Sequence, residues 1–124
     1  KRDGVRHIFY RSSHLTEKAV LTLTASRSPG EKALGILTDM LRERCPDVTG
    51  LVLNRNTARG NTVLAGEFDT VWGSEMLTEG LCGLTFTLSP RSFFQVNPPQ
   101  AERLYEAALD YAGITPDMTA EELF

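Results

Sequence analysis

The apolar residues in the first half of the chain change their spacing twice. Residues 5–12 and 18–25 are rich in β-branched and aromatic types, which predicts two strands. Only a short stretch separates them, so we expect a hairpin with antiparallel pairing. The spacing then becomes helical, with apolar residues at Ala33, Leu34, Leu37, Met40 and Leu41.

Both ends of this predicted helix are marked in the sequence. Ser28 and Glu31 have the spacing of a capping box, in which each side chain accepts a hydrogen bond from a backbone N–H at the helix start. Pro29 fits the first helical position, and Pro46 stops the run. Residues 48–56 return to a strand pattern that ends in an amide-rich turn.

The second half alternates short apolar runs with glycines and acidic residues, which predicts a meander of short strands. We expect these strands near residues 62–65, 69–72, 75–79 and 83–88. A second helix begins after Asn97, with Pro98 at its first position, and ends at Gly113. Its apolar face consists of Ala101, Leu104, Tyr105, Ala108 and Ala112.

These elements define the expected fold class. Strands joined by short turns pair antiparallel, whereas a parallel return needs a long crossover. We therefore predict an α+β fold with a single antiparallel or mixed β-sheet and two main helices packed on it. The 124 residues are the size of one domain with a single core.

The amino-acid composition narrows the class of protein further. Apolar residues make up 41% and charged residues 23% of the chain, so disorder is not expected. Because no apolar run is long enough for a membrane span and no signal peptide opens the chain, we expect a cytoplasmic protein with no membrane partner. Cys45 and Cys82 are expected to be buried free thiols rather than a disulfide. His7 and His14 have no third ligand at a suitable spacing, so we predict no metal site.

Charge is divided unevenly along the chain. Residues 1–60 hold eleven basic and six acidic residues, whereas residues 61–124 hold two basic and ten acidic residues. Ten of the thirteen basic residues are arginines, which suit bidentate phosphate contacts. Such a division is typical of a surface that faces nucleic acid, and solvated surface charge explains it equally well.

The chain contains none of the common catalytic motifs. It has no glycine-rich nucleotide loop and no G-x-S-x-G elbow. The carboxylates of the second half fall at predicted strand ends and turns, where we expect them to be solvated: Glu67, Asp69, Glu75 and Glu79. We therefore predict no catalytic residue in this chain.

Residues 88–105, LSPRSFFQVNPPQAERLY, form the most specific segment of the sequence. They resemble a signature of the RNA uracil-C5 methyltransferases, which make 5-methyluridine in ribosomal or transfer RNA. The family's Ser-Phe-x-Gln-x-Asn run is matched by Ser92, Phe93, Gln95 and Asn97. Other segments resemble the family in the same order, namely residues 3–11, 50–56 and 61–73, the last in the form seen in ribosomal RNA members.

The resemblance implies the organisation of a longer enzyme. Residues 1–117 correspond to its central α+β domain, and residues 118–124 to the start of the missing S-adenosylmethionine-binding domain or to a disordered tail. Family members add an N-terminal OB-like domain and a C-terminal Rossmann-like domain with the cofactor site, the nucleophilic cysteine and the general base. Some also carry an iron–sulfur cluster.

Three interpretations of the chain follow from this resemblance. In the first, it is part of a methyltransferase that acts on ribosomal rather than transfer RNA, and it is inactive alone. In the second, it is a non-catalytic RNA-binding or interaction module of shared ancestry. In the third, it is a scaffold domain that only positions its neighbours.

The same resemblance implies roles for individual residues. Phe93 and Gln95 are expected to meet the flipped uracil and the cofactor, whereas Phe94 is expected to enter the core. Asn97 fits both a helix cap and a residue of the site. The candidates for RNA phosphate contacts, with plain surface arginines as the alternative, are Arg55, Arg59 and Arg91.

Overall fold

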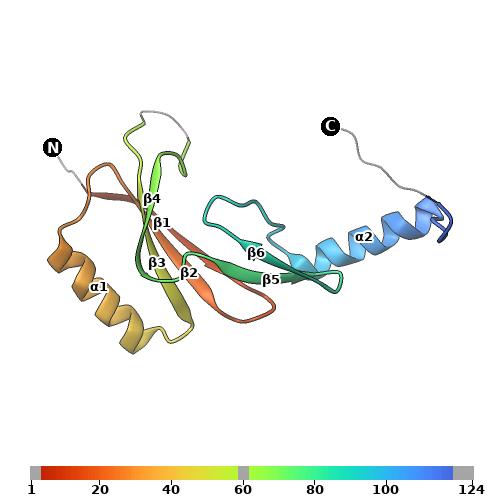
Figure 1. Cartoon of the computed structure of the whole chain (residues 1–124), viewed down its shortest axis with the longest axis horizontal. Helices are drawn as coiled ribbons and strands as arrows, with labels where there is room; N and C mark the ends of the chain where they lie inside the picture. The colour runs from red at the N-terminus through yellow and green to blue at the C-terminus, as the bar shows by residue number, and fades with distance from the viewer. Residues whose placement is uncertain (1–3, 59–61, 119–124) are drawn as a thin grey trace.

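The computed structural model describes residues 4–58 and 62–118, and Figure 1 shows how their helices and strands are arranged. In chain order the elements are β1 (Val5–Ser12), β2 (Ala19–Ala25), α1 (Glu31–Arg44), β3 (Val48–Arg55), β4 (Glu67–Gly73), β5 (Leu77–Leu81), β6 (Leu84–Leu88) and α2 (Pro98–Ala112). Strands β1 to β4 form one sheet, and β5 and β6 form a second. The predicted α+β class is confirmed, although the described strands divide between two sheets where the sequence predicts one.

The four-stranded sheet is mixed, in the order β1-β2-β3-β4. Strands β1 and β2 pair antiparallel, as do β3 and β4, while β2 and β3 pair parallel. The parallel pair follows from the chain order, because α1 lies between β2 and β3 and provides the long crossover. These two central strands are buried along nearly their whole length, which matches their content of leucine, valine and threonine.

Each face of this sheet carries its own apolar cluster. On one face, α1 packs its partly buried Leu34 and Leu37 and its buried Leu41 against β2 and β3. The cluster on the other face joins both sheets and the segment before α2, and consists of Val20, Val52, Leu77, Leu88, Phe68 and Phe94. Leu77 and Leu88 face each other at the open end of the β5–β6 hairpin, so this end anchors the hairpin to the main sheet.

Helix α2 lies apart from the main sheet. It packs against β5 of the second sheet, and only Ala101 of the helix is buried. Figure 1 shows α2 extending away from the four-stranded sheet. Its large apolar side chains are exposed, namely Leu104, Tyr105, Leu109 and Tyr111. The expected packing of both helices on one sheet therefore holds for α1 and differs for α2.

The strand predicted at residues 62–65 does not form, and these residues lead as a loop into β4. The reason lies in two buried amide side chains at the end of β3. Asn56 donates to the carbonyl oxygens of Thr62 (2.8 Å) and Val63 (3.1 Å), and Asn54 donates to that of Ala65 (2.8 Å). The side-chain amides thus satisfy backbone groups that a strand ladder would otherwise pair.

Two further expectations are wrong. Helix α1 begins at Glu31 without a side-chain cap, because the Ser28 hydroxyl donates to the carbonyl oxygen of Pro29 instead. The predicted capping box is therefore absent. Cys45 and Cys82 are free, as expected, but both are exposed rather than buried, since one follows α1 and the other lies in the tight β5–β6 turn.

Candidate functional site

The segment between β6 and α2 begins with a closed turn. The Ser92 N–H donates to the carbonyl oxygen of Ser89 (3.0 Å), and the Ser92 hydroxyl accepts from the Ser89 N–H (3.1 Å). Arg11 on β1 donates from Nη1 to the same carbonyl oxygen of Ser89 (3.2 Å). The start of the Ser-Phe-x-Gln-x-Asn run is therefore tied to the main sheet.

Beyond this turn, Phe94 is the side chain that packs inward, and its neighbours at 93, 95 and 96 are exposed. Phe94 is half-buried in the cluster shared by the two sheets, with its ring centroid 5.9 Å from that of Phe86 on β6. Phe93 is 80% exposed, Val96 is 97% exposed, and Gln95 is also exposed. The expected packing of Phe94 on the core is confirmed, with the ring half-buried, whereas the expected contact of Phe93 with the uracil and the cofactor stays a prediction.

Asn97 is the N-cap of α2. Its side chain accepts a hydrogen bond from the Gln100 N–H (3.3 Å), and Pro98 takes the first helical position. At the other end, Gly113 closes the helix in the left-handed region with φ 60°, as the sequence predicts. The cap role is sufficient to explain Asn97 at this position.

A cleft of about 590 Å³ lies between this segment and the turn that follows β1. Its walls include the side chains of Arg11, His14, Glu79, Gln95 and Asn97. Phe93 is not among the residues that line it. The structure thus brings Gln95 and Asn97 to one cleft, together with a cationic and an anionic side chain, and places Phe93 outside it.

Glu79 on β5 is buried at this cleft, which contradicts its expected solvated position. Its carboxylate accepts from the N–H groups of His14 (2.8 Å), Leu15 (3.0 Å) and Gly80 (2.9 Å). Burial raises the pKa of Glu79, but these N–H donors and the Ser13 hydroxyl outweigh it and hold the pKa below its ordinary value. The sequence carried a signal for this, because alternation places Glu79 on the same strand face as buried Leu77.

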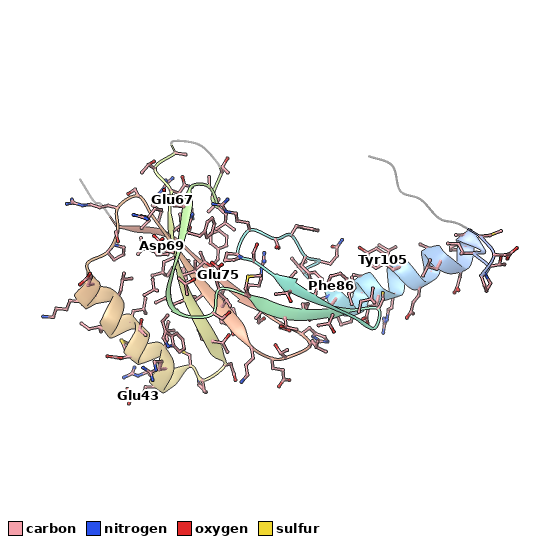
Figure 2. All side chains as sticks on the ribbon, in the orientation of Figure 1. Glu43, Glu67, Asp69, Glu75, Phe86 and Tyr105 are labelled. Carbon is pink, nitrogen blue, oxygen red and sulfur yellow. The ribbon has the colours of Figure 1, made fainter. Side chains whose placement is uncertain are left out.

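Two of the three candidate arginines meet the start of β4. Arg55 forms ion pairs with Glu67 (3.0 Å) and Asp69 (2.7 Å), the two acidic residues labelled on β4 in Figure 2. Arg91 donates from Nη2 to the carbonyl oxygen of Gly66 and lies over the ring of Phe68, with 4.5 Å between the guanidinium carbon and the ring centroid.

The remaining candidate, Arg59, lies outside the described residues, as do residues 119–124 of the predicted tail.

Within residues 4–58 and 62–118, no group of three His, Cys, Asp or Glu side chains is placed to hold a metal ion. Helices in that part of the chain are all too short or too polar to cross a membrane. His7 instead lies near Phe9, with 6.4 Å between the ring centroids.

Comparison with known proteins gives relatives along nearly the whole chain. It is 37% identical over 116 residues to an uncharacterised RNA methyltransferase of Oceanobacillus iheyensis. The matched region covers 94% of this chain and 25% of the relative. It is 32% identical over 123 residues to an uncharacterised RNA methyltransferase of Listeria innocua, which covers 99% of this chain and 27% of the relative. No protein-family model matches the chain.

The fold also has a counterpart among solved structures. The crystal structure of Pyrococcus abyssi tRNA (uracil-54, C5)-methyltransferase in complex with S-adenosyl-L-homocysteine superposes with a TM-score of 0.62. The match covers 86% of this chain and 24% of that one, at 20% sequence identity, and therefore shows a shared fold.

The chain is homologous to one part of these two RNA methyltransferases, which confirms the predicted resemblance at the level of RNA methyltransferases. With the tRNA (uracil-54, C5)-methyltransferase it shares the fold. It spans about a quarter of the length of the relatives it matches.

Proposed function

We propose that this chain is the central part of an S-adenosylmethionine-dependent RNA uracil-C5 methyltransferase that acts on ribosomal RNA. The observation that carries the proposal is that only some side chains of the Ser-Phe-x-Gln-x-Asn run have a structural role. Phe94 packs on the core and Asn97 caps α2, while Phe93 and Gln95 are exposed. A ring and an amide at the surface are suited to stack on and hydrogen-bond to an unstacked base.

The chemistry explains why such groups are needed. Carbon 5 of uracil is a weak nucleophile, so a cysteine thiolate adds at carbon 6 to create an enolate. After the methyl group is attached to carbon 5, a base removes the carbon-5 proton and the thiolate leaves carbon 6, which restores the double bond. S-adenosylmethionine supplies the methyl group when bound. The target base has to be flipped from its stack and held. We assign the holding role to Phe93 and Gln95, and the thiolate, base and cofactor site to the rest of the longer enzyme.

The basic half of the chain is proposed to contact RNA phosphates. Arg55 and Arg59 belong to this half, and the segment at 61–73 resembles ribosomal RNA members of the family. Arg55 has to exchange its ion pairs with Glu67 and Asp69 for a phosphate, which reduces the net gain from the contact. We therefore expect the RNA affinity to depend on several basic groups rather than on Arg55 alone.

Helix α2 is proposed to pack against other domains of the same polypeptide, an OB-like and a Rossmann-like domain. Leu104 is 66%, Leu109 58% and Tyr111 94% exposed in this chain. Tyr105 and Phe86, labelled in Figure 2, add two half-covered rings on α2 and β6. Apolar surface gathered in this way is typical of an interface, and three-quarters of each relative lies outside the matched region.

Turnover of the Gln95→Ala variant of the longer enzyme tests the proposed function. We expect the thermal midpoint to stay unchanged and the single-turnover rate on ribosomal RNA to fall about ten-fold or more, equivalent to about 1.4 kcal/mol of transition-state stabilisation. Gln100→Ala is the matched control, because it removes the same side-chain amide at an exposed position on α2 outside the cleft.

Three outcomes contradict the proposal. An unchanged rate in a folded Gln95→Ala variant removes the amide from the site, and an unfolded variant makes it a structural group. A longer protein that binds RNA without transferring a methyl group supports the alternative of a non-catalytic RNA-binding module.

A further inference from the structure

We infer that Arg91 is a positioning residue that holds the loop displaying Phe93 and Gln95, and that it is not a phosphate contact. The inference rests on the proposed function, since it concerns the same Ser-Phe-x-Gln-x-Asn run. It assigns a role to the cation–π contact between Arg91 and Phe68, which the methyl-transfer chemistry itself does not use.

The contacts of Arg91 bridge two distant parts of the chain. Its guanidinium lies over Phe68, with the central carbon 4.5 Å from the ring centroid, and Nη2 donates to the carbonyl oxygen of Gly66. Phe68 is itself half-buried in the cluster that joins the two sheets. The guanidinium is therefore engaged by a ring and by a backbone carbonyl of the protein, and a phosphate that takes the place of these contacts releases the loop.

The acceptor of this hydrogen bond is held in place by its backbone. Gly66 has φ +89°, a region that favours glycine, and a Cβ at this position would lie 2.2 Å from the carbonyl oxygen of Arg55. The chain therefore passes close to β3 at Gly66 before it enters β4. Arg91 thus donates to the carbonyl of a residue that lies against the end of β3, one residue before β4 begins.

Other contacts fix the same loop on both sides of Arg91. Arg11 and Ser92 both bind the carbonyl oxygen of Ser89, and Phe94 packs beside Phe86. Phe93 lies between these anchors and Gln95 directly follows Phe94, and both side chains are exposed. A side chain that must meet a reacting group is most effective when its neighbours are already locked, because little ordering remains to be done on binding.

The test uses variants that separate the ring contact from the charge. Arg91→Lys keeps the charge but loses the planar group, Phe68→Leu keeps apolar bulk but loses the ring, and Phe68→Tyr keeps the ring. Arg103→Ala, at an exposed position on α2, controls for loss of one positive charge. Single-turnover rates at saturating ribosomal RNA, RNA affinity against salt, and amide hydrogen exchange of residues 89–96 are measured for each.

We expect Arg91→Lys and Phe68→Leu each to lower the single-turnover rate about five-fold or more, with RNA affinity and its salt dependence unchanged. The double variant is no slower than the slower single variant, because both break one contact. Phe68→Tyr keeps the wild-type rate. Hydrogen exchange of residues 89–96 becomes faster in Arg91→Lys and Phe68→Leu and stays the same in Arg103→Ala.

A phosphate contact gives the opposite pattern and overturns the inference. Arg91→Lys then keeps its rate and its slow hydrogen exchange, while Arg91→Ala loses RNA affinity and about one unit of the log–log salt slope. Hydrogen exchange separates this failure from that of the proposed function. If exchange is faster in Arg91→Lys but the rate is unaffected in Gln95→Ala, Arg91 still holds the loop, and the proposed role of Gln95 in methyl transfer is rejected.

Discussion

Two regions of the molecule, the four-stranded sheet with α1 and the part from β5 to α2, differ in burial: β2 and β3 are buried along nearly their whole length, whereas α2 buries only Ala101. In the four-stranded sheet, polar side chains are buried: Asn54 is fully buried, accepts from the Thr24 hydroxyl (3.3 Å) and donates to the carbonyl oxygens of Ala65 (2.8 Å) and Glu67 (3.2 Å). In the region from β5 to α2, apolar side chains are exposed, including Leu84, Phe93, Leu109 and Tyr111. Among the described residues, every buried side-chain nitrogen and oxygen has a hydrogen-bond partner.

This difference teaches where to look for function. The Asn-x-Asn run that contributes to the family resemblance is explained by the fold, because Asn54 and Asn56 bind the backbone of the loop before β4. The exposed apolar residues of the second region have no such explanation within the chain. Residues that meet the RNA base or another domain are therefore expected in the second region, and residues that hold the fold in the first.

The largest expected effect on stability is in the core of the main sheet. Leu51 on β3 is fully buried, so Leu51→Ala removes its packing and leaves a cavity. We expect a loss of about 2–5 kcal/mol in the free energy of unfolding, measured by urea denaturation. Leu109→Ala on α2 makes the same chemical change at a position that is 58% exposed, and is expected to cost less than about 0.5 kcal/mol. Equal losses in the two variants contradict the division between the regions.

The next effect concerns the buried carboxylate where the two regions meet. Glu79→Gln replaces an acceptor oxygen by a donor opposite N–H groups, so we expect a loss of about 1–3 kcal/mol at neutral pH. Because the pKa of Glu79 is lowered by folding, its contribution is complete above the unfolded-state pKa and is lost as pH falls through the folded-state pKa. The gap between wild type and variant should therefore shrink on acidification below about pH 4.

The control for this experiment is Glu106→Gln, which changes an exposed carboxylate on α2. We expect it to leave the unfolding free energy unchanged across the same pH range. A gap for Glu79→Gln that stays constant down to about pH 3 indicates that the carboxylate charge does not contribute. Denaturation curves at several pH values decide between these outcomes.

The sequence predicted elements with strong local signals and missed those that depend on distant contacts. Asn97, Pro98 and Gly113 bound α2 as expected, because caps act within a few residues. The loop at 62–65 was mistaken for a strand, since the buried amides that bind its backbone come from β3. The burial of Glu79 depends on N–H groups of the β1–β2 turn, 64 and 65 positions away in the chain.

The candidate site also combines features that the sequence predicted with contacts that it could not predict. Alternation along the chain separated Phe93 from Phe94 correctly, because neighbouring side chains of an extended segment point to opposite sides. The partners of Arg91 and Arg55 were not predictable from the sequence. These partners lie on or beside β4, and they come close to the two arginines only when the sheet forms. A phosphate role inferred from residue type alone therefore did not take account of these intramolecular contacts.

The smallest effect distinguishes the two adjacent rings of the loop. Phe94 is half-buried beside Phe86, so Phe94→Ala is expected to cost about 1–1.5 kcal/mol, roughly half the value for a fully buried ring. Phe93→Ala removes an equally large ring that is 80% exposed, and we expect no measurable change in the unfolding free energy. In the longer enzyme the order reverses: Phe93→Ala lowers the single-turnover rate of methyl transfer while the protein stays as stable as wild type. Paired denaturation and turnover measurements on the two variants check this reversal, and a Phe93→Ala enzyme with the wild-type rate removes Phe93 from the site.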